Sequence, residues 1–175
     1  KLVKKLAANN LKVSELAVEC WSDRKWKHGG FSTNEANIRR EMVKLFKDAI
    51  AFSKEIKAES VLLWPAHDGL DYPFQTNYRD GWKYLVDTIR EIGELDAAVK
   101  ICVEYKSKDP RQRQYVSNVG KLMLLLNDVG LANVSGVVDV GHALMCQENL
   151  AESLVILDAH GKLGQIHLNE NYKDS

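Results

Sequence analysis

Short apolar runs alternate with longer amphipathic stretches along the whole chain. The apolar runs are continuous, as expected of strands buried on both faces, and the stretches between them repeat apolar residues at helical spacing. The predicted strands are 13–21, 60–64, 99–105, 134–139 and 163–168. The predicted helices are 1–10, 32–57, 78–92, 112–127 and 149–160. Ser32 or Thr33 is the expected N-cap of the second helix.

Strands and helices in strict alternation predict an α/β fold with a parallel sheet. Two architectures fit this order, a doubly wound open sheet and a (β/α)8 TIM barrel. Neither GxGxxG nor GxxxxGK[ST] occurs, so nucleotide binding has no support. Polar residues end several strands, as at the mouth of a barrel, and we favour the barrel. About five strand–helix units cannot close one, so we expect residues 1–175 to form one partial TIM-barrel domain of a longer protein.

Charge, apolar runs and cysteine positions limit the classes of binding partner and the cellular compartment that we expect. Lys and Arg together number 24, as do Asp and Glu, so no basic field predicts nucleic-acid binding. No apolar run approaches the roughly 20 residues of a membrane helix. The cysteines, Cys20, Cys102 and Cys146, are far apart in sequence, which predicts reduced thiols and a cytoplasmic protein.

Four of the predicted strands end in polar or aromatic side chains that could form one pocket. These residues are Trp64 with His67 and Asp68, Glu104 with Lys106, Asp139 with His142, and His167 with Asn169 and Glu170. Carboxylates and imidazoles suit a divalent cation such as Mn, Mg, Co or Zn, and the lack of cysteine argues against a structural zinc site.

Each of these residues also has a simpler interpretation. Glu104 could be a solvated strand end or pair with Lys106, Asp139 could form a turn, and His142 could cap a helix. An aromatic residue such as Trp64 at a strand end usually packs in the core. The recurrence of the pattern on four strands favours a metal site.

At these residues the chain resembles the xylose isomerase-like TIM barrels, and within them the L-rhamnose isomerase and related sugar isomerase branch. The matching segments are 63–69, 103–106, 138–142 and 166–169. The resemblance spans about 13–172 and would correspond to barrel strands three to seven. It implies that Glu104 bridges two divalent metals, usually Mn, although Co, Mg and Zn are alternatives.

The resemblance also implies roles for the other residues. Asp139 and His167 would complete most of the first metal shell, and His142 would bind the second, catalytic metal. Lys106 would polarise the carbonyl oxygen of an open-chain sugar, and Trp64 would form a hydrophobic wall against the sugar carbons. The expected catalytic residues are Lys106, Glu104 and His142. The expected substrate-binding residues are Trp64, Lys106 and His142.

The implied reaction is aldose–ketose isomerisation by a metal-assisted hydride shift between C1 and C2, an intramolecular oxidoreduction. The alternative is a ketose 3-epimerase or sugar dehydratase of the same superfamily, in which paired carboxylates move a proton through an enediol. Such epimerases generally lack a lysine at the position of Lys106, which favours the isomerase. A catalytically incomplete barrel fragment is the third possibility.

The resemblance further implies a small-molecule sugar as substrate and a homo-oligomer, often a tetramer. A last metal ligand, an acid on strand eight, would lie beyond Ser175. Asp174 lies at the edge of the acidic cluster that would complete the second metal site.

Overall fold

A computed structural model describes residues 2–171 of the chain. Its main sheet has the strand order β1-β2-β4-β6-β7, and every neighbouring pair is parallel. The strands are β1 (Glu15–Ala17), β2 (Ser60–Leu63), β4 (Ile101–Glu104), β6 (Val134–Asp139) and β7 (Leu163–His167). All five lie within predicted strands, and β1 is the most shortened, with three residues.

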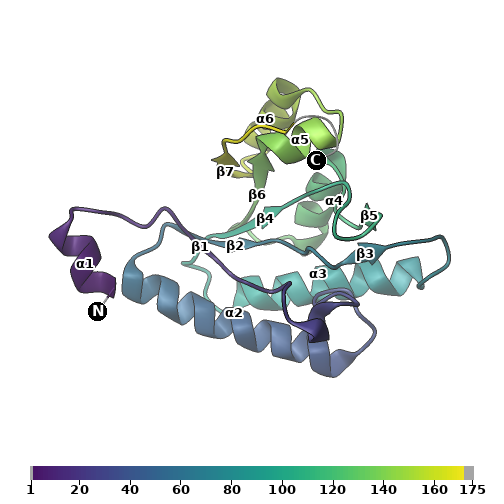
Figure 1. Ribbon diagram of the computed structural model, residues 1–175, viewed down its shortest axis with the longest axis horizontal. Coiled ribbons are helices and arrows are strands. Elements are labelled where there is room, and N and C mark those ends of the chain that lie inside the picture. Colours follow the sequence, from purple (N-terminus) through teal and green to yellow (C-terminus); the bar gives the residue numbers. More distant parts are fainter. Residues whose placement is uncertain (1, 172–175) are drawn as a thin grey trace.

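Four helices, α2 (Ala36–Ile56), α3 (Tyr78–Glu94), α4 (Val119–Val129) and α6 (Leu150–Ala159), form one layer against this sheet (Figure 1). Helix α1 (Leu2–Ala8) contacts α2, α5 (Val140–Met145) directly follows β6, and a 3-10 turn lies at Arg24–Trp26. Helix α2 packs against α3, α3 against α4, and α4 against α6. Among residues 2–171, no helix is long and apolar enough to cross a membrane.

Strand order and helix packing decide between the two predicted architectures. A doubly wound sheet reverses its strand order and carries helices on both faces. Here the order follows the sequence without reversal, and successive crossover helices touch one another on one side of the sheet. The sheet also curls from β1 to β7 (Figure 1). The partial TIM barrel is therefore confirmed.

The two faces of the sheet have different surroundings because side chains alternate along a strand. Val61 and Val103 point outward into a large core shared with the helices. Leu62, Cys102 and Val137 form a separate small cluster on the inner face. Residues two positions apart on a strand point to the same face. Glu104, which ends β4, therefore points inward like Cys102, and Asp139, which ends β6, points inward like Val137.

A second, two-stranded sheet joins the loops that follow β2 and β4. β3 (Gly69–Leu70) pairs antiparallel with β5 (Arg113–Gln114). The Gln114 side-chain amide donates to the Ala66 carbonyl at 2.8 Å, and the Tyr115 N–H donates to the Asp68 carbonyl at 3.0 Å. These bonds fix both loops beside the carboxyl ends of β2 and β4.

The helix predicted at 112–127 begins only at Val119, so its predicted start was wrong. Arg113–Gln114 is extended because it pairs with β3. The Asn118 side chain then caps the helix by accepting the N–H of Lys121 at 2.8 Å. Pairing with β3, a segment distant in sequence, thus determines where α4 begins.

The predicted N-cap of α2 was also wrong. Glu35 occupies the N-cap position and its side chain makes no capping hydrogen bond. The Ser32 N–H instead donates to Asp68, and the Thr33 hydroxyl accepts from the Glu35 N–H at 3.3 Å. Both residues shape the loop before the helix.

The three cysteines are free thiols, as predicted. Burial raises the pKa of Cys102 and of Cys146 to about 11. Both side chains therefore remain protonated at neutral pH; Cys102 is a small buried group and Cys146 is partly buried.

Replacing Leu122 by alanine tests the packing of α4 on the sheet. Leu122 is fully buried beside Gly136 of β6, whereas Leu124 on the same helix is 51% exposed. Leu122→Ala should lower the free energy of unfolding by about 2–5 kcal/mol because it leaves a cavity. Leu124→Ala should change it by about 0.5 kcal/mol or less. Urea denaturation compares the two variants, and equal losses would contradict the packing described.

Candidate metal centre

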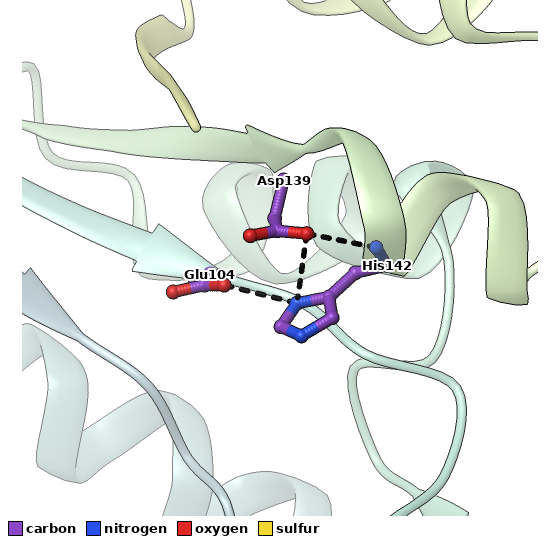
Figure 2. A group of neighbouring side chains, drawn as sticks. All are labelled: Glu104, Asp139 and His142. Carbon is purple, nitrogen blue, oxygen red and sulfur yellow. Dashed lines mark hydrogen bonds and ion pairs between the residues drawn. The ribbon is translucent and has the colours of Figure 1, made fainter. Parts of the chain in front are cut away.

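Three side chains from two neighbouring strand ends form a compact group (Figure 2). Glu104 ends β4, Asp139 ends β6, and His142 lies in the first turn of α5. Each offers one ligand atom, and these atoms all lie within 4.8 Å of one another. Asp139 Oδ1 accepts the His142 backbone N–H at 2.8 Å, so the carboxylate that caps α5 also fixes the position of the histidine.

The group is buried and rich in acceptors. Glu104 is 6% exposed and Asp139 is 5% exposed. His142 Nδ1 lies 2.9 Å from Glu104 Oε1 and 3.8 Å from Asp139 Oδ1. Nevertheless, this buried ring nitrogen has no partner in hydrogen-bonding geometry. A nitrogen and carboxylate oxygens facing one another without a shared hydrogen bond fit a divalent cation between them.

His167 lies on the other side of the two carboxylates. Its Nδ1 is 3.7 Å from Glu104 Oε2 and 3.9 Å from Asp139 Oδ2. The structure therefore brings together the whole predicted ligand set, Glu104, Asp139, His142 and His167. Their role as ligands stays a prediction.

Sequence reasoning missed a further carboxylate in the same place. Glu15 begins β1, and its Oε1 lies 3.3 Å from His167 Nε2. Burial raises the pKa of Glu15, and the neighbouring His167 opposes that rise. Glu15 is one of two glutamates, with Glu19, in the strand predicted at 13–21, and nothing in the sequence connects it with His167.

Trp64, the predicted hydrophobic wall, borders the cluster. Its ring stacks on the His142 imidazole with centroids 6.2 Å apart and an interplanar angle of 27°. The Trp21 ring meets it edge-on at 5.2 Å. Trp64 is only partly buried, so one part of its surface is available to a bound molecule.

Lys106 also lies near the cluster, but its ammonium group does not pair with Glu104. Its Nζ is 2.8 Å from Asp109 Oδ2 and 5.5 Å from the centre of the Trp64 ring. Lys106 lines a cavity of about 210 Å³ together with Asp139 and His142. Two of the predicted substrate-binding residues, Lys106 and His142, thus share one opening with the candidate ligand Asp139.

Two residues singled out at the end of the second predicted strand lie elsewhere. His67 Nε2 is 3.0 Å from the Trp21 carbonyl. Asp68 is 2% exposed and accepts the backbone N–H groups of residues 30, 31 and 32. Burial raises the pKa of Asp68, and these hydrogen bonds oppose the rise. Asp68 therefore anchors a loop instead of joining the cluster, and Asp174 lies outside the described residues.

Asn169 holds Asp139 from the loop after β7. Its side-chain amide donates to Asp139 Oδ2 at 2.7 Å, and its Oδ1 accepts the Gly141 N–H at 2.5 Å. Gly141 suits this contact because a Cβ there would lie 2.6 Å from Asn169 Oδ1. Both Asp139 oxygens thus have a donor, which fixes the orientation of the carboxylate.

Comparison with curated proteins gives distant relatives over nearly the whole chain. The xylose isomerase of Sinorhizobium fredii is 23% identical over 182 residues, which cover 95% of this chain and 39% of that protein. The xylose isomerase of Thermus thermophilus is 25% identical over 177 residues, covering 95% of this chain and 44% of that protein. The chain thus spans about two fifths of the length of these relatives.

Solved structures share the fold at low identity. A D-tagatose 3-epimerase-like protein superposes with a TM-score of 0.80 at 19% identity, covering 99% of this chain and 62% of that chain. A 3-keto-D-glucoside 4-epimerase from E. coli also gives 0.80, at 14% identity, covering 97% and 63%. The family model described as "Xylose isomerase-like TIM barrel" matches residues 1–175. The chain therefore belongs to the xylose isomerase-like TIM barrel family.

Proposed function

We propose that this chain carries the metal-binding part of a metal-dependent sugar isomerase that interconverts aldoses and ketoses. The observation that carries the proposal is the buried Glu104, Asp139 and His142 group at the carboxyl ends of parallel strands, where barrel enzymes place their catalytic residues. The names of the curated relatives, xylose isomerases, support it. Membership of the L-rhamnose isomerase branch remains a finer prediction from the motifs.

Glu104, Asp139, His142 and His167 would hold the cation. A divalent metal bound there would supply Lewis-acid polarisation of the sugar oxygens at C1 and C2. Oxygen and imidazole donors accept several first-row metals, so Mn is a proposal and the donor set alone does not select it. Because Glu104 and Asp139 are buried, their electrostatic contacts are stronger than they would be in bulk water.

Lys106 would turn its ammonium from Asp109 toward the carbonyl oxygen of the open-chain sugar. The Asp109 side chain is 72% exposed and that of Lys106 is 11% exposed, and ion pairs with a solvent-exposed partner contribute only about 0–1 kcal/mol. Giving up this pair therefore costs little compared with stabilising charge on the carbonyl oxygen, for which removal of one donor typically costs about 2.7–4 kcal/mol. Trp64 would exclude water from the sugar carbons.

A ketose epimerase is the second candidate, and the position of Lys106 favours it. In the structure the ammonium pairs with the Asp109 carboxylate at 2.8 Å. In this alternative, carboxylates of the cluster move a proton through an enediol, and Lys106 takes no part. Several structures of the same fold bear the names of ketose 3-epimerases.

Glu104→Gln tests the ligand set. The substitution removes the negative charge and leaves a much weaker oxygen ligand, so calorimetric titration with Mn²⁺ should show no binding where the unaltered protein saturates. Glu91→Gln, at an exposed position of α3, loses the same charge and should bind as the unaltered protein does. Unchanged Mn²⁺ affinity of the Glu104 variant would refute its ligand role.

Lys106→Met separates the two reactions in the full natural protein. If the isomerase proposal holds, aldose–ketose conversion should fall by about 10²–10³-fold while Mn²⁺ affinity is retained. Chromatography of the sugar products measures this, with Lys121→Met on α4 as the exposed control. Formation of a ketose epimer that is insensitive to the Lys106 change would favour the epimerase. Metal binding without any turnover would favour the incomplete barrel.

Asn169→Ala tests the support of Asp139. Because the variant frees Asp139 Oδ2 and the Gly141 N–H, Mn²⁺ affinity should fall by about tenfold or more. The matched control is Asn171→Ala, whose amide donates only to the Gly141 carbonyl, at 3.2 Å. Equal Mn²⁺ affinity in the two variants would show that the bond to Asp139 does not orient a ligand.

A further inference from the structure

The His167 imidazole is contacted at both of its nitrogens. Nδ1 faces the carboxylates of the cluster, at 3.7 Å from Glu104 Oε2 and 3.9 Å from Asp139 Oδ2. Nε2 faces the opposite way and lies 3.3 Å from Glu15 Oε1. The ring therefore lies between Glu15 and the cluster, and Glu15 contacts the candidate ligands through His167.

The contact with Glu15 crosses the inside of the curled sheet. Glu15 is on β1 and His167 is on β7, the two strands that end the strand order. The neighbouring Gln165 makes a parallel crossing, because its side-chain amide donates to the Ser14 carbonyl at 3.2 Å and to the Ser60 hydroxyl at 2.5 Å. Two adjacent inward positions of β7 are thus fixed against the β1–β2 side.

Among the described residues, Glu15 forms an ion pair with His167 alone. Its side chain is 15% exposed, and its second oxygen, Oε2, is buried without a hydrogen-bond partner. Ser60, a nearby hydroxyl, is engaged by Gln165 instead. A buried carboxylate is costly unless it is paired, so the His167 contact is the interaction that favours this position of Glu15.

The contact with Glu15 bears on which ring nitrogen of His167 carries the hydrogen. A neutral imidazole has one N–H and one lone pair, and an ionised carboxylate is an acceptor only. Carboxylates face both ring nitrogens, but Glu15 is the nearer, at 3.3 Å from Nε2 against 3.7 and 3.9 Å from Nδ1 to the cluster. The N–H is therefore favoured at Nε2, which leaves the lone pair of Nδ1 facing the cluster. The hydrogen bond at one ring nitrogen determines which nitrogen is free to bind a metal.

We propose that Glu15 is a positioning residue that holds His167 as the Nε2–H tautomer and presents Nδ1 to a divalent cation shared with Glu104 and Asp139. The inference rests on the proposed metal-dependent function. It extends that function by adding a carboxylate from β1 that does not touch the cation.

Mn²⁺ affinity in a double-mutant cycle tests whether Glu15 acts through His167. Measured by calorimetry, Glu15→Leu should weaken Mn²⁺ binding by about 10–100-fold. Glu15→Gln, whose amide oxygen can accept the same hydrogen bond, should recover most of that loss. In a His167→Ala background, Glu15→Leu should cause little further loss, because the two residues act as one unit. Glu59→Leu removes an exposed carboxylate that lines the same pocket as Glu15 and His167, and it should leave affinity unchanged.

Nitrogen-15 NMR of the histidine side chains tests the tautomer without metal and without a variant. The metal-free protein should show His167 with its hydrogen on Nε2, and Glu15→Leu should shift it toward a mixture of tautomers. A hydrogen on Nδ1 in the unaltered protein would overturn the inference.

The outcomes separate the inference from the function on which it rests. If the unaltered protein binds no Mn²⁺, Co²⁺, Mg²⁺ or Zn²⁺, the proposed function fails and the inference fails with it. If Mn²⁺ binds but Glu15→Leu leaves its affinity unchanged, or if the losses from Glu15→Leu and His167→Ala add fully, the inference alone is overturned.

Discussion

The inward direction of the last residues of β4 and β6 is the constraint on which the candidate site depends. Parallel strands bring their carboxyl ends to one edge, and the two-residue period of a strand places Glu104 and Asp139 on the face marked by Cys102 and Val137. A shift by one residue would turn both carboxylates into the helix-facing core. The register between β4 and β6 therefore fixes the spacing of the ligands as well as the stability of the sheet.

The outer face holds that register in place. Tyr105, which lies between Glu104 and Lys106 in sequence, is fully buried, and its hydroxyl donates to Glu148 Oε2 at 2.5 Å. The other oxygen of Glu148 accepts the Val119 N–H at the start of α4 at 2.7 Å. A single, partly buried carboxylate thus ties the end of β4 to a helix, and Tyr105 cannot turn inward without breaking this network. Its two sequence neighbours are thereby directed to the opposite face.

Local patterns were sufficient for the residues whose geometry is local. Glu104 and Asp139 follow apolar runs directly, and His142 lies three residues after Asp139, within reach of one helical turn. Long-range contacts decided the rest. The segment before Val119 became a strand because β3 pairs with it, although its own sequence continues the helical spacing.

Long-range contacts also explain why Asp68 was wrongly grouped with the strand-end residues and why Glu15 was missed. Asp68 follows β2 as the ligands follow their strands, but the loop turns it toward the N–H groups of residues 30–32, a partner that no spacing in the sequence announces. Glu15 became relevant only because the curl of the sheet carries β7 across to β1.

Burying several acidic side chains inside the sheet costs folding free energy unless a cation compensates their charge. Glu15, Glu104 and Asp139 face one interior, and the described ion pairs of all three run to the imidazoles of His142 and His167. Removing an ionised group from water costs several kcal/mol, and a neutral imidazole compensates only part of that cost. A divalent cation bound by the folded chain and not by the unfolded one would shift the folding equilibrium by mass action. The clustering of acidic side chains that costs folding free energy is thus the same arrangement that would give the site affinity for a metal.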